Sequence, residues 1–347
     1  MLTSLVTTNM LSKLLIWLTI FFVFFIFASC VQRLISEVRE KRRVRLELGF
    51  RLWLKDAVEA EKKFRPDLLP KEFRKMEAMI PVLEESDRTF SGKWWKDFRE
   101  GITIEFLLPK ARKMAKSFSL NNRHFAVRSF VLAPLVADEA ILLELLSDKA
   151  DSVRIEAAIC AVLIGSEVLL TALMQRLSKE PERLHFAYKD ALKSGTSETV
   201  KWLVSQFSKE NNPELQIVYI EVLAVLLGDE VIELVKPLIS SSDSGVKLAA
   251  VRALALHPPK SAFPELLALA GEPDPRIRIA AATALRIAKG EDVGRVLQQL
   301  LDDPKLKVQL AAANALRKSG RKSVLKMSTE SSPSAAFVLA LPEDLDP

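Results

Sequence analysis

Apolar and polar positions recur with a period of about 31 residues through most of the chain after residue 120. The segments VKLAAVRALAL, IRIAAATALRI and VQLAAANALRK begin at Val246, Ile277 and Val308, and each has the apolar spacing of one helix face. Stepping back by the same interval reaches four further segments without an insertion, which begin at Asn122, Val153, Leu184 and Leu215. The pattern predicts seven amphipathic helices in register.

Equivalent positions in these segments carry the same kind of side chain, as one repeated helix requires. Two residues after each start stand His124, Ile155, Phe186, Ile217, Leu248, Ile279 and Leu310. Four residues after it, where neighbouring helices approach closely, stand Ala126, Ala157, Tyr188, Tyr219, Ala250, Ala281 and Ala312. Eight residues after it stand Phe130, Ala161, Leu192, Leu223, Leu254, Leu285 and Leu316. The second position is polar throughout: Arg123, Arg154, His185, Gln216, Lys247, Arg278 and Gln309.

A second helix is predicted after each first one. Its apolar anchors recur at the same interval, at Leu142, Leu173, Val204, Val235, Leu266 and Leu297. Glycine or proline separates the helices, and Asp274-Pro275 and Asp303-Pro304 stand where helices should begin, because Asp caps a helix and Pro suits its first turn. A hairpin of this size cannot bury its apolar faces alone, so the hairpins must stack. We therefore predict an all-α fold, an α-solenoid of about seven helical hairpins.

Segments such as DPRIRIAAATALRIAKG and DSVRIEAAICAVLIG resemble HEAT repeats in their short bacterial form, also seen in phycobilisome-lyase-type proteins. The resemblance covers about residues 120–326 and concerns architecture rather than function. Gln216 and Gln309 stand where such families have the arginine of a side-chain ladder, which puts a continuous ladder in doubt. With this architecture our leading hypothesis is a non-enzymatic scaffold that presents the solenoid surface to a partner protein. The alternative that the resemblance implies is a lyase-type or other ligand-handling enzyme that uses the concave face.

Near the N-terminus, LLIWLTIFFVFFIFASCV, residues 14–31, contains no charge and is long enough to cross a bilayer. A basic cluster follows at once: Arg33, Arg39, Lys41, Arg42, Arg43 and Arg45. Positive residues stay in the cytoplasm, so we predict an uncleaved, single-pass anchor of the inner membrane with the solenoid inside and the cluster on anionic lipid. In the alternative, Phe27-Ala28-Ser29-Cys30 is a lipoprotein processing site and the solenoid lies outside the cytoplasm.

The predicted organisation is therefore a short N-terminal segment (1–13), a transmembrane helix (14–31), a basic helical connector (32–118), the repeat solenoid (119–327) and a flexible tail (328–347). In the connector, one helix face is formed by Leu46, Phe50, Trp53, Ala57, Ala60 and Phe64, and we expect that face to pack on its neighbours rather than to form a coiled coil. In the tail, AAFVLALP either folds back over the last repeat, which we favour, or serves as a docking motif.

Charge and motif content narrow the function further. Residues 1–120 carry 23 Lys and Arg against 15 Asp and Glu, whereas the rest of the chain carries 27 against 29. A body that binds nucleic acid needs a clustered cationic surface, so this balance argues against one. The three histidines, His124, His185 and His257, have no partners at metal-ligand spacing, and no nucleotide-binding or hydrolase motif occurs. We predict no catalytic residue, cofactor, metal or small-molecule ligand.

A protein partner remains the predicted ligand of the solenoid. Two positions before the anchors of the second helices stand Thr171, Trp202, Glu233, Pro264 and Arg295. Two helical steps rotate a side chain by about 200°, so this column should face away from the core. We predict that Trp202 is exposed on the inner, concave surface, and that the partner-binding residues are Trp202, Arg176, Gln206 and Arg295. The alternative, which the sequence leaves equally open, is that neighbouring side chains shield Trp202.

Overall fold

The computed structural model describes residues 2–59, 69–321 and 332–340, and within the first helix it describes side chains from Trp17 onward. It is all-helical over these residues, which confirms the predicted fold class. The chain divides into two compact units, unit 1 (Met1–Ala133) and unit 2 (Pro134–Pro347), and each is described by itself. The predicted domain boundaries stay predictions.

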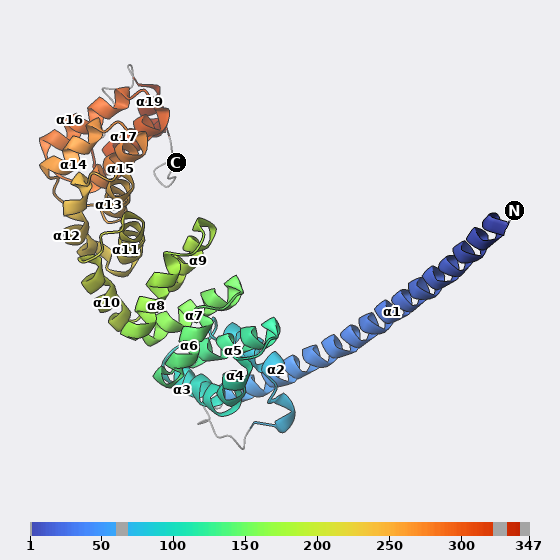
Figure 1. The fold of residues 1–347 in the computed structure, drawn as a ribbon. Helices are drawn as coiled ribbons and strands as arrows, with labels where there is room; N and C mark the ends of the chain where they lie inside the picture. Colours follow the sequence, from blue (N-terminus) through green and yellow to red (C-terminus); the bar gives the residue numbers. More distant parts are fainter. Residues whose placement is uncertain (1, 60–68, 322–331, 341–347) are drawn as a thin grey trace. The chain divides into compact units, whose positions relative to one another are not determined.

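Unit 1 is a long helix followed by shorter ones. These are α1 (Leu2–Glu59), α2 (Met76–Ser86), α3 (Lys93–Ile102), a π-helical turn (Thr103–Leu107), α4 (Leu108–Met114) and α5 (Leu120–Leu132). Helix α1 has 58 residues and is about 87 Å long at 1.5 Å per residue. Figure 1 shows it projecting far beyond the other helices of unit 1, which surround only its C-terminal end. Its N-terminal part therefore needs another environment for its apolar side chains.

The C-terminal part of α1 is part of the core of unit 1. Phe50 and Ala57 are buried where α1 packs on α2, and Phe50 and Trp53 stack at 5.8 Å between ring centroids. A Cβ on Gly49 would come within 2.5 Å of the Phe73 ring, so glycine lets the ring lie this close to α1. The expected packing of this face is confirmed as far as Ala57, and Ala60 and Phe64 lie outside the described residues.

Unit 2 is a series of helical hairpins. Its first helices are α7 (Asp151–Ile164), α9 (Glu182–Lys193), α11 (Pro213–Leu226), α13 (Ser244–Leu256), α15 (Pro275–Ala284) and α17 (Leu306–Lys318). Its second helices are α6 (Glu139–Leu145), α8 (Glu167–Leu177), α10 (Ser197–Phe207), α12 (Val231–Val235), α14 (Pro264–Ala268), α16 (Glu291–Gln299) and α19 (Pro333–Ala340). Each first helix after α7 packs on the first helix before it, which is the stacking that the period requires.

Local signals in the sequence set where these helices begin and end. Asp274 caps α15 by accepting a hydrogen bond from the Arg276 amide at 2.8 Å, as predicted, and Asn212 does the same at the start of α11. Asp303 accepts from the Lys305 amide, but α17 begins only at Leu306. Gly165 ends α7 with φ of 70°, a conformation that favours glycine.

The core of unit 2 follows the predicted columns at the positions four and eight residues after each start, which are buried in every hairpin. Cys160 is buried among them as a small apolar side chain, and burial raises the pKa of its thiol. The column two residues after each start is only partly buried, and Phe186 is 71% exposed there. Helix α19 packs on α17 with Ala335 and Val338 buried, so this part of the tail folds back as expected and is helical rather than loose.

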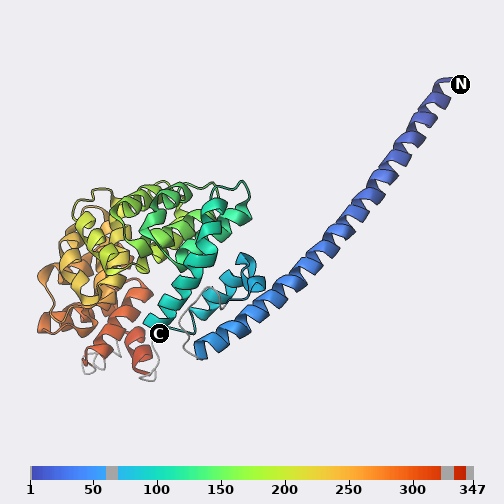
Figure 2. The same cartoon turned by 90° about the horizontal axis from the view of Figure 1, so that it is seen from below.

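Figures 1 and 2 show the hairpins of unit 2 following one another along a curve in chain order, from green through yellow to red. In Figure 1 the second helices α12, α14 and α16 lie along the outer side of this curve, and the first helices α11, α13 and α15 lie along its inner side. The first helices of these hairpins, and not the second ones, therefore line the inner side of the curve (Figure 1). The curvature depends on packing between hairpins, which periodicity does not specify.

Candidate functional site

The polar position at the start of the first helices binds the loop before its helix in six of seven cases, Lys247 being the exception. Its side chain makes a hydrogen bond to a backbone carbonyl five or six residues earlier. The pairs are Arg123 with Ser117 (3.0 Å), Arg154 with Asp148 (2.8 Å), His185 with Glu180 (3.0 Å), Gln216 with Glu210 (2.6 Å), Arg278 with Glu272 (2.8 Å) and Gln309 with Asp303 (2.7 Å). Glutamine thus makes the same backbone contact as arginine, and the two substitutions do not interrupt this part of the ladder.

Some members of the column also bind the loop that follows. Ion pairs join Arg154 to Glu180 (2.6 Å), Lys247 to Glu272 (2.7 Å) and Arg278 to Asp303 (2.6 Å). At Gln309 a neutral contact replaces the ion pair, because the Ser334 hydroxyl donates to its side-chain oxygen at 2.8 Å. The three ion pairs therefore connect a first helix to the loop that precedes the next first helix, and the Gln309 contact connects α17 to α19.

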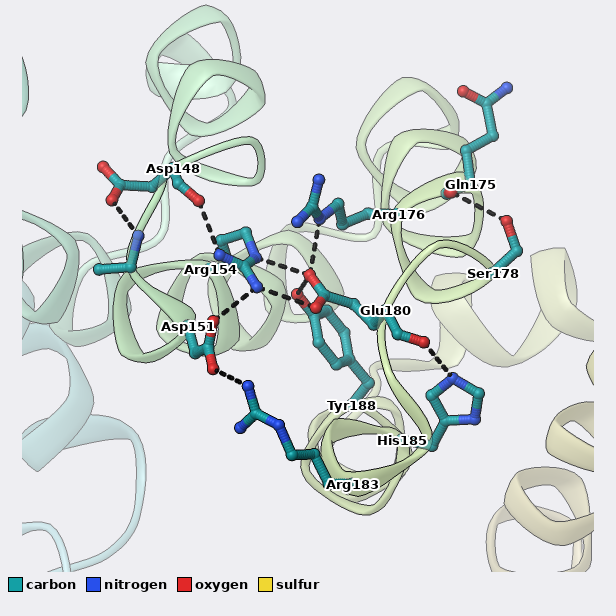
Figure 3. Close-up of polar contacts among 11 residues, drawn as sticks. Asp148, Asp151, Arg154, Gln175, Arg176, Ser178, Glu180, Arg183, His185 and Tyr188 are labelled. Atoms are coloured by element: carbon teal, nitrogen blue, oxygen red, sulfur yellow. Dashed lines mark hydrogen bonds and ion pairs between the residues drawn. The ribbon is translucent and has the colours of Figure 1, made fainter.

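The most buried part of this ladder surrounds Glu180 (Figure 3). Its carboxylate accepts hydrogen bonds from Arg154 and Arg176 and from the Tyr188 hydroxyl, the last at 3.1 Å. Burial acts to raise the pKa of the Glu180 carboxyl, but the hydrogen bonds from the two guanidinium groups outweigh it, and the pKa lies below its ordinary value. A fully partnered carboxylate of this kind holds structure together and has no proton to transfer near neutral pH.

The structure separates the four predicted partner-binding residues. Arg176 belongs to the Glu180 cluster, whereas Arg295 is exposed on α16 and faces Asp292 at 3.4 Å. Trp202 and Gln206 lie one turn apart on α10. The prediction that Trp202 is exposed is wrong: it is half-buried, and its buried indole N–H has no hydrogen-bond partner among the described residues. The reason is that Leu203 and Phe207 point inward in α10 instead of Val204, which turns the neighbouring Trp202 partly inward.

An exposed apolar column that the sequence analysis missed runs along the last turns of successive first helices. Val225, Leu256 and Ile287 are 51%, 54% and 44% exposed, and they occupy equivalent positions of the repeat on α11, α13 and the turn after α15. These first helices pack on one another, so the column continues from hairpin to hairpin. Its signal in the sequence was an apolar residue ten positions after the start of three successive segments.

The predicted basic cluster lies on α1 and is mostly solvent-exposed. Arg33 pairs with Glu37 at 3.5 Å, and Arg43 pairs with Glu40 and Glu47 at 2.6 and 3.2 Å. Within the part of the chain that the structure describes, its remaining members make no ion pair: Arg39, Lys41, Arg42 and Arg45. Their charge is therefore available to an anionic partner.

The remaining ionisable groups provide little chemistry. In the described ranges, no three His, Cys, Asp or Glu side chains come together as metal ligands. His185 contacts the Glu180 carbonyl, and His257 contacts Asp229 at 3.2 Å. Burial lowers the pKa of His124, which favours its neutral form.

A stack of helical hairpins joined by side-chain ladders defines an α-solenoid. Residues 233–317 match the family model of HEAT repeats, and this matched stretch lies inside the predicted repeat region. HEAT repeats are helical scaffolds for interactions with other molecules. No protein of curated function matches the sequence significantly. The stretch Trp17–Glu59 of α1 is long and apolar enough to cross a membrane, a property that signal sequences share.

Proposed function

We propose that the protein is a non-enzymatic scaffold, anchored in the membrane by α1, that binds a protein partner through the first helices of its HEAT-like solenoid. The exposed column Val225, Leu256 and Ile287 carries this proposal. Exposed apolar residues in register on neighbouring helices form a continuous apolar surface, and such surfaces mark interaction sites. A repeated surface suits an extended segment or a helix of a partner, because each hairpin adds one more contact.

Two observations support the membrane anchor. Between Trp17 and Phe27 the large apolar side chains of α1 are about half to three-quarters exposed, and the candidate membrane-crossing window is unburied in the structure. In water this exposure would be costly, whereas each such side chain favours insertion into a bilayer. The basic cluster that follows favours a cytoplasmic position for the rest of the chain, next to anionic lipid.

The partner surface is tested by photocrosslinking in cells that express the full-length protein. A crosslinking amino acid at Leu256 is expected to capture a discrete partner, and the same group at Arg295 on α16 is expected to capture none. The Leu256→Asp/Ile287→Asp double variant should lose the crosslink from position 225 by about tenfold or more, since burial of two apolar side chains is removed. Leu306→Asp, at a residue 62% exposed but outside the column, is the control.

Capture from position 295 but not from position 256 would overturn the assignment of the first-helix surface and favour the second helices. Circular dichroism of each variant checks that the helices stay intact. Leu256, Ile287 and Leu306 are all at least 44% exposed, so no loss of fold is expected.

A further inference from the structure

A groove in unit 1 runs along α1 where that helix leaves the other helices. Its volume is about 1410 Å³, above the range of about 300–1000 Å³ usual for pockets that hold small molecules. One wall is α1 from Ala28 to Glu47, and the other walls come from α2, α4 and α5. A groove of this size and position suits an elongated ligand rather than a compact one.

The α1 wall changes character along its length. Ala28, Val31 and Ile35 line the end nearer the N-terminus, and Arg39, Arg42 and Arg43 line much of the rest, beside Leu46. Steps of three and four residues put these positions on one face of the helix. Ile35 and Arg39 are one turn apart, an axial rise of about 6 Å. That is the depth of the headgroup layer in one leaflet of a bilayer, about 5–7 Å.

Cationic side chains in the groove exceed the carboxylates that could neutralise them. The carboxylates Glu40 and Glu47 both pair with Arg43. Within the described residues, the lining side chains of Arg39, Arg42 and Lys75 make no ion pair, and Glu77 is the one lining carboxylate likewise without one. The charged end of the groove is therefore complementary to an anion.

The loop between α4 and α5, which joins two helices that line the groove, carries an exposed aromatic side chain. Met114, Asn121 and Phe125 on either side of this loop line the groove. Phe118 is 99% exposed, yet its loop is fixed, because the Arg123 guanidinium donates to the carbonyls of Ser117 and Phe118 at 3.0 and 2.9 Å. An aromatic side chain held out of the protein surface is typical of residues that enter a membrane interface.

We propose that this groove binds one anionic phospholipid of the membrane in which α1 is anchored. Its acyl chains lie against Ala28, Val31 and Ile35, its phosphate is bound by Arg39, Arg42 and Lys75, and Phe118 enters the interface beside it. The inference rests on the proposed membrane anchor and goes beyond it, because a basic cluster alone attracts anionic lipid without selecting a site.

The test uses the full-length protein in nanodiscs of phosphatidylcholine with a minor fraction of phosphatidylglycerol, followed by native mass spectrometry. The wild type is expected to retain one phosphatidylglycerol. The groove variant Arg39→Gln/Arg42→Gln/Lys75→Gln should lose affinity by about fivefold per charge, or about a hundredfold in total. The matched control Arg33→Gln/Lys41→Gln/Arg45→Gln removes the same charge from residues that do not line the groove, and it should retain the lipid within about twofold.

Equal losses of affinity in the two variants would show that the groove is not a specific lipid site and that the whole basic surface attracts anionic lipid. Retention of phosphatidylcholine in place of phosphatidylglycerol, or a dimer that the groove variant dissociates, would overturn the anionic lipid as the occupant. In each of these results the protein still enters the nanodisc, so the anchor stands. Failure of the wild type to enter nanodiscs would overturn the anchor and the lipid site together.

Discussion

The Glu180 carboxylate is almost wholly removed from water, with a side chain 1% exposed, and it accepts hydrogen bonds from two guanidinium groups and a phenol. Its pKa is lower in the folded protein than the ordinary value of 4.5. A carboxylate of lowered pKa stabilises the fold at pH values above that ordinary value. This contribution is lost as the pH falls below about 4.5 and through the folded-state pKa.

Glu180→Gln should therefore destabilise unit 2 by about 1–3 kcal/mol at neutral pH, because the buried Arg154 guanidinium then keeps only its ion pair with Asp151. Below pH 4.5 the difference from the wild type should shrink, since protonation removes the same charge. Urea unfolding followed by circular dichroism across this pH range measures both effects. Glu182→Gln is the control, at an exposed carboxylate two positions further along the chain. A pH-independent difference would contradict the ionised role of Glu180.

Helix α19 is connected to the ladder by one residue of α17. The Gln309 side chain donates to the Asp303 carbonyl at 2.7 Å and accepts from the Ser334 hydroxyl at 2.8 Å. The same position in earlier hairpins binds the following loop through an ion pair. The last hairpin thus uses a neutral contact for the same task.

Gln309→Leu should loosen α19 without unfolding the hairpins before it. Hydrogen exchange in residues 333–340 is expected to accelerate by about tenfold, since each net hydrogen bond contributes about 0.5–1.5 kcal/mol. Exchange in α13 and α15 should stay unchanged. Lys307→Leu on the same helix is the control, because Lys307 is exposed. Unchanged exchange in Gln309→Leu would mean that α19 is held by its apolar contacts alone, and equal acceleration in both variants would mean that the Gln309 contact is not the cause.

The orientation of the whole molecule depends on the charges that flank the apolar run. Six Lys or Arg residues follow it within residues 33–45, and only Lys13 precedes it. Because positive charge stays in the cytoplasm, unit 2 should lie there.

An alkaline phosphatase reporter fused after Leu46 is expected to be inactive, and a fluorescent protein at the same joint is expected to fold and fluoresce. An active phosphatase would place unit 2 outside the cytoplasm and favour lipid attachment at Cys30. The Cys30→Ser variant distinguishes an uncleaved membrane helix from a lipid anchor, because the substitution abolishes lipid attachment and leaves an uncleaved helix in place.

The constant period of the repeat was enough to predict the hairpins, the buried columns and the stacking. The reason is that a repeated amphipathic helix of one length has few ways to bury its apolar face. The apolar run and the basic cluster could be identified from the sequence just as directly, because they depend only on length and composition. In contrast, Leu203 and Val204 are adjacent apolar residues, and the pattern could not decide which points inward.

Tertiary packing alone decided the remaining features. Packing half-buried Trp202 and left the apolar side chain of Phe186 exposed to solvent. It also brought Glu180, from the loop before α9, into an ion pair with Arg154. It also placed the first helices on the inner side of the curve (Figure 1). Curvature and loop contacts depend on how neighbouring hairpins fit together in three dimensions. Periodicity along one chain specifies which residues are apolar, but not the angle at which successive hairpins pack.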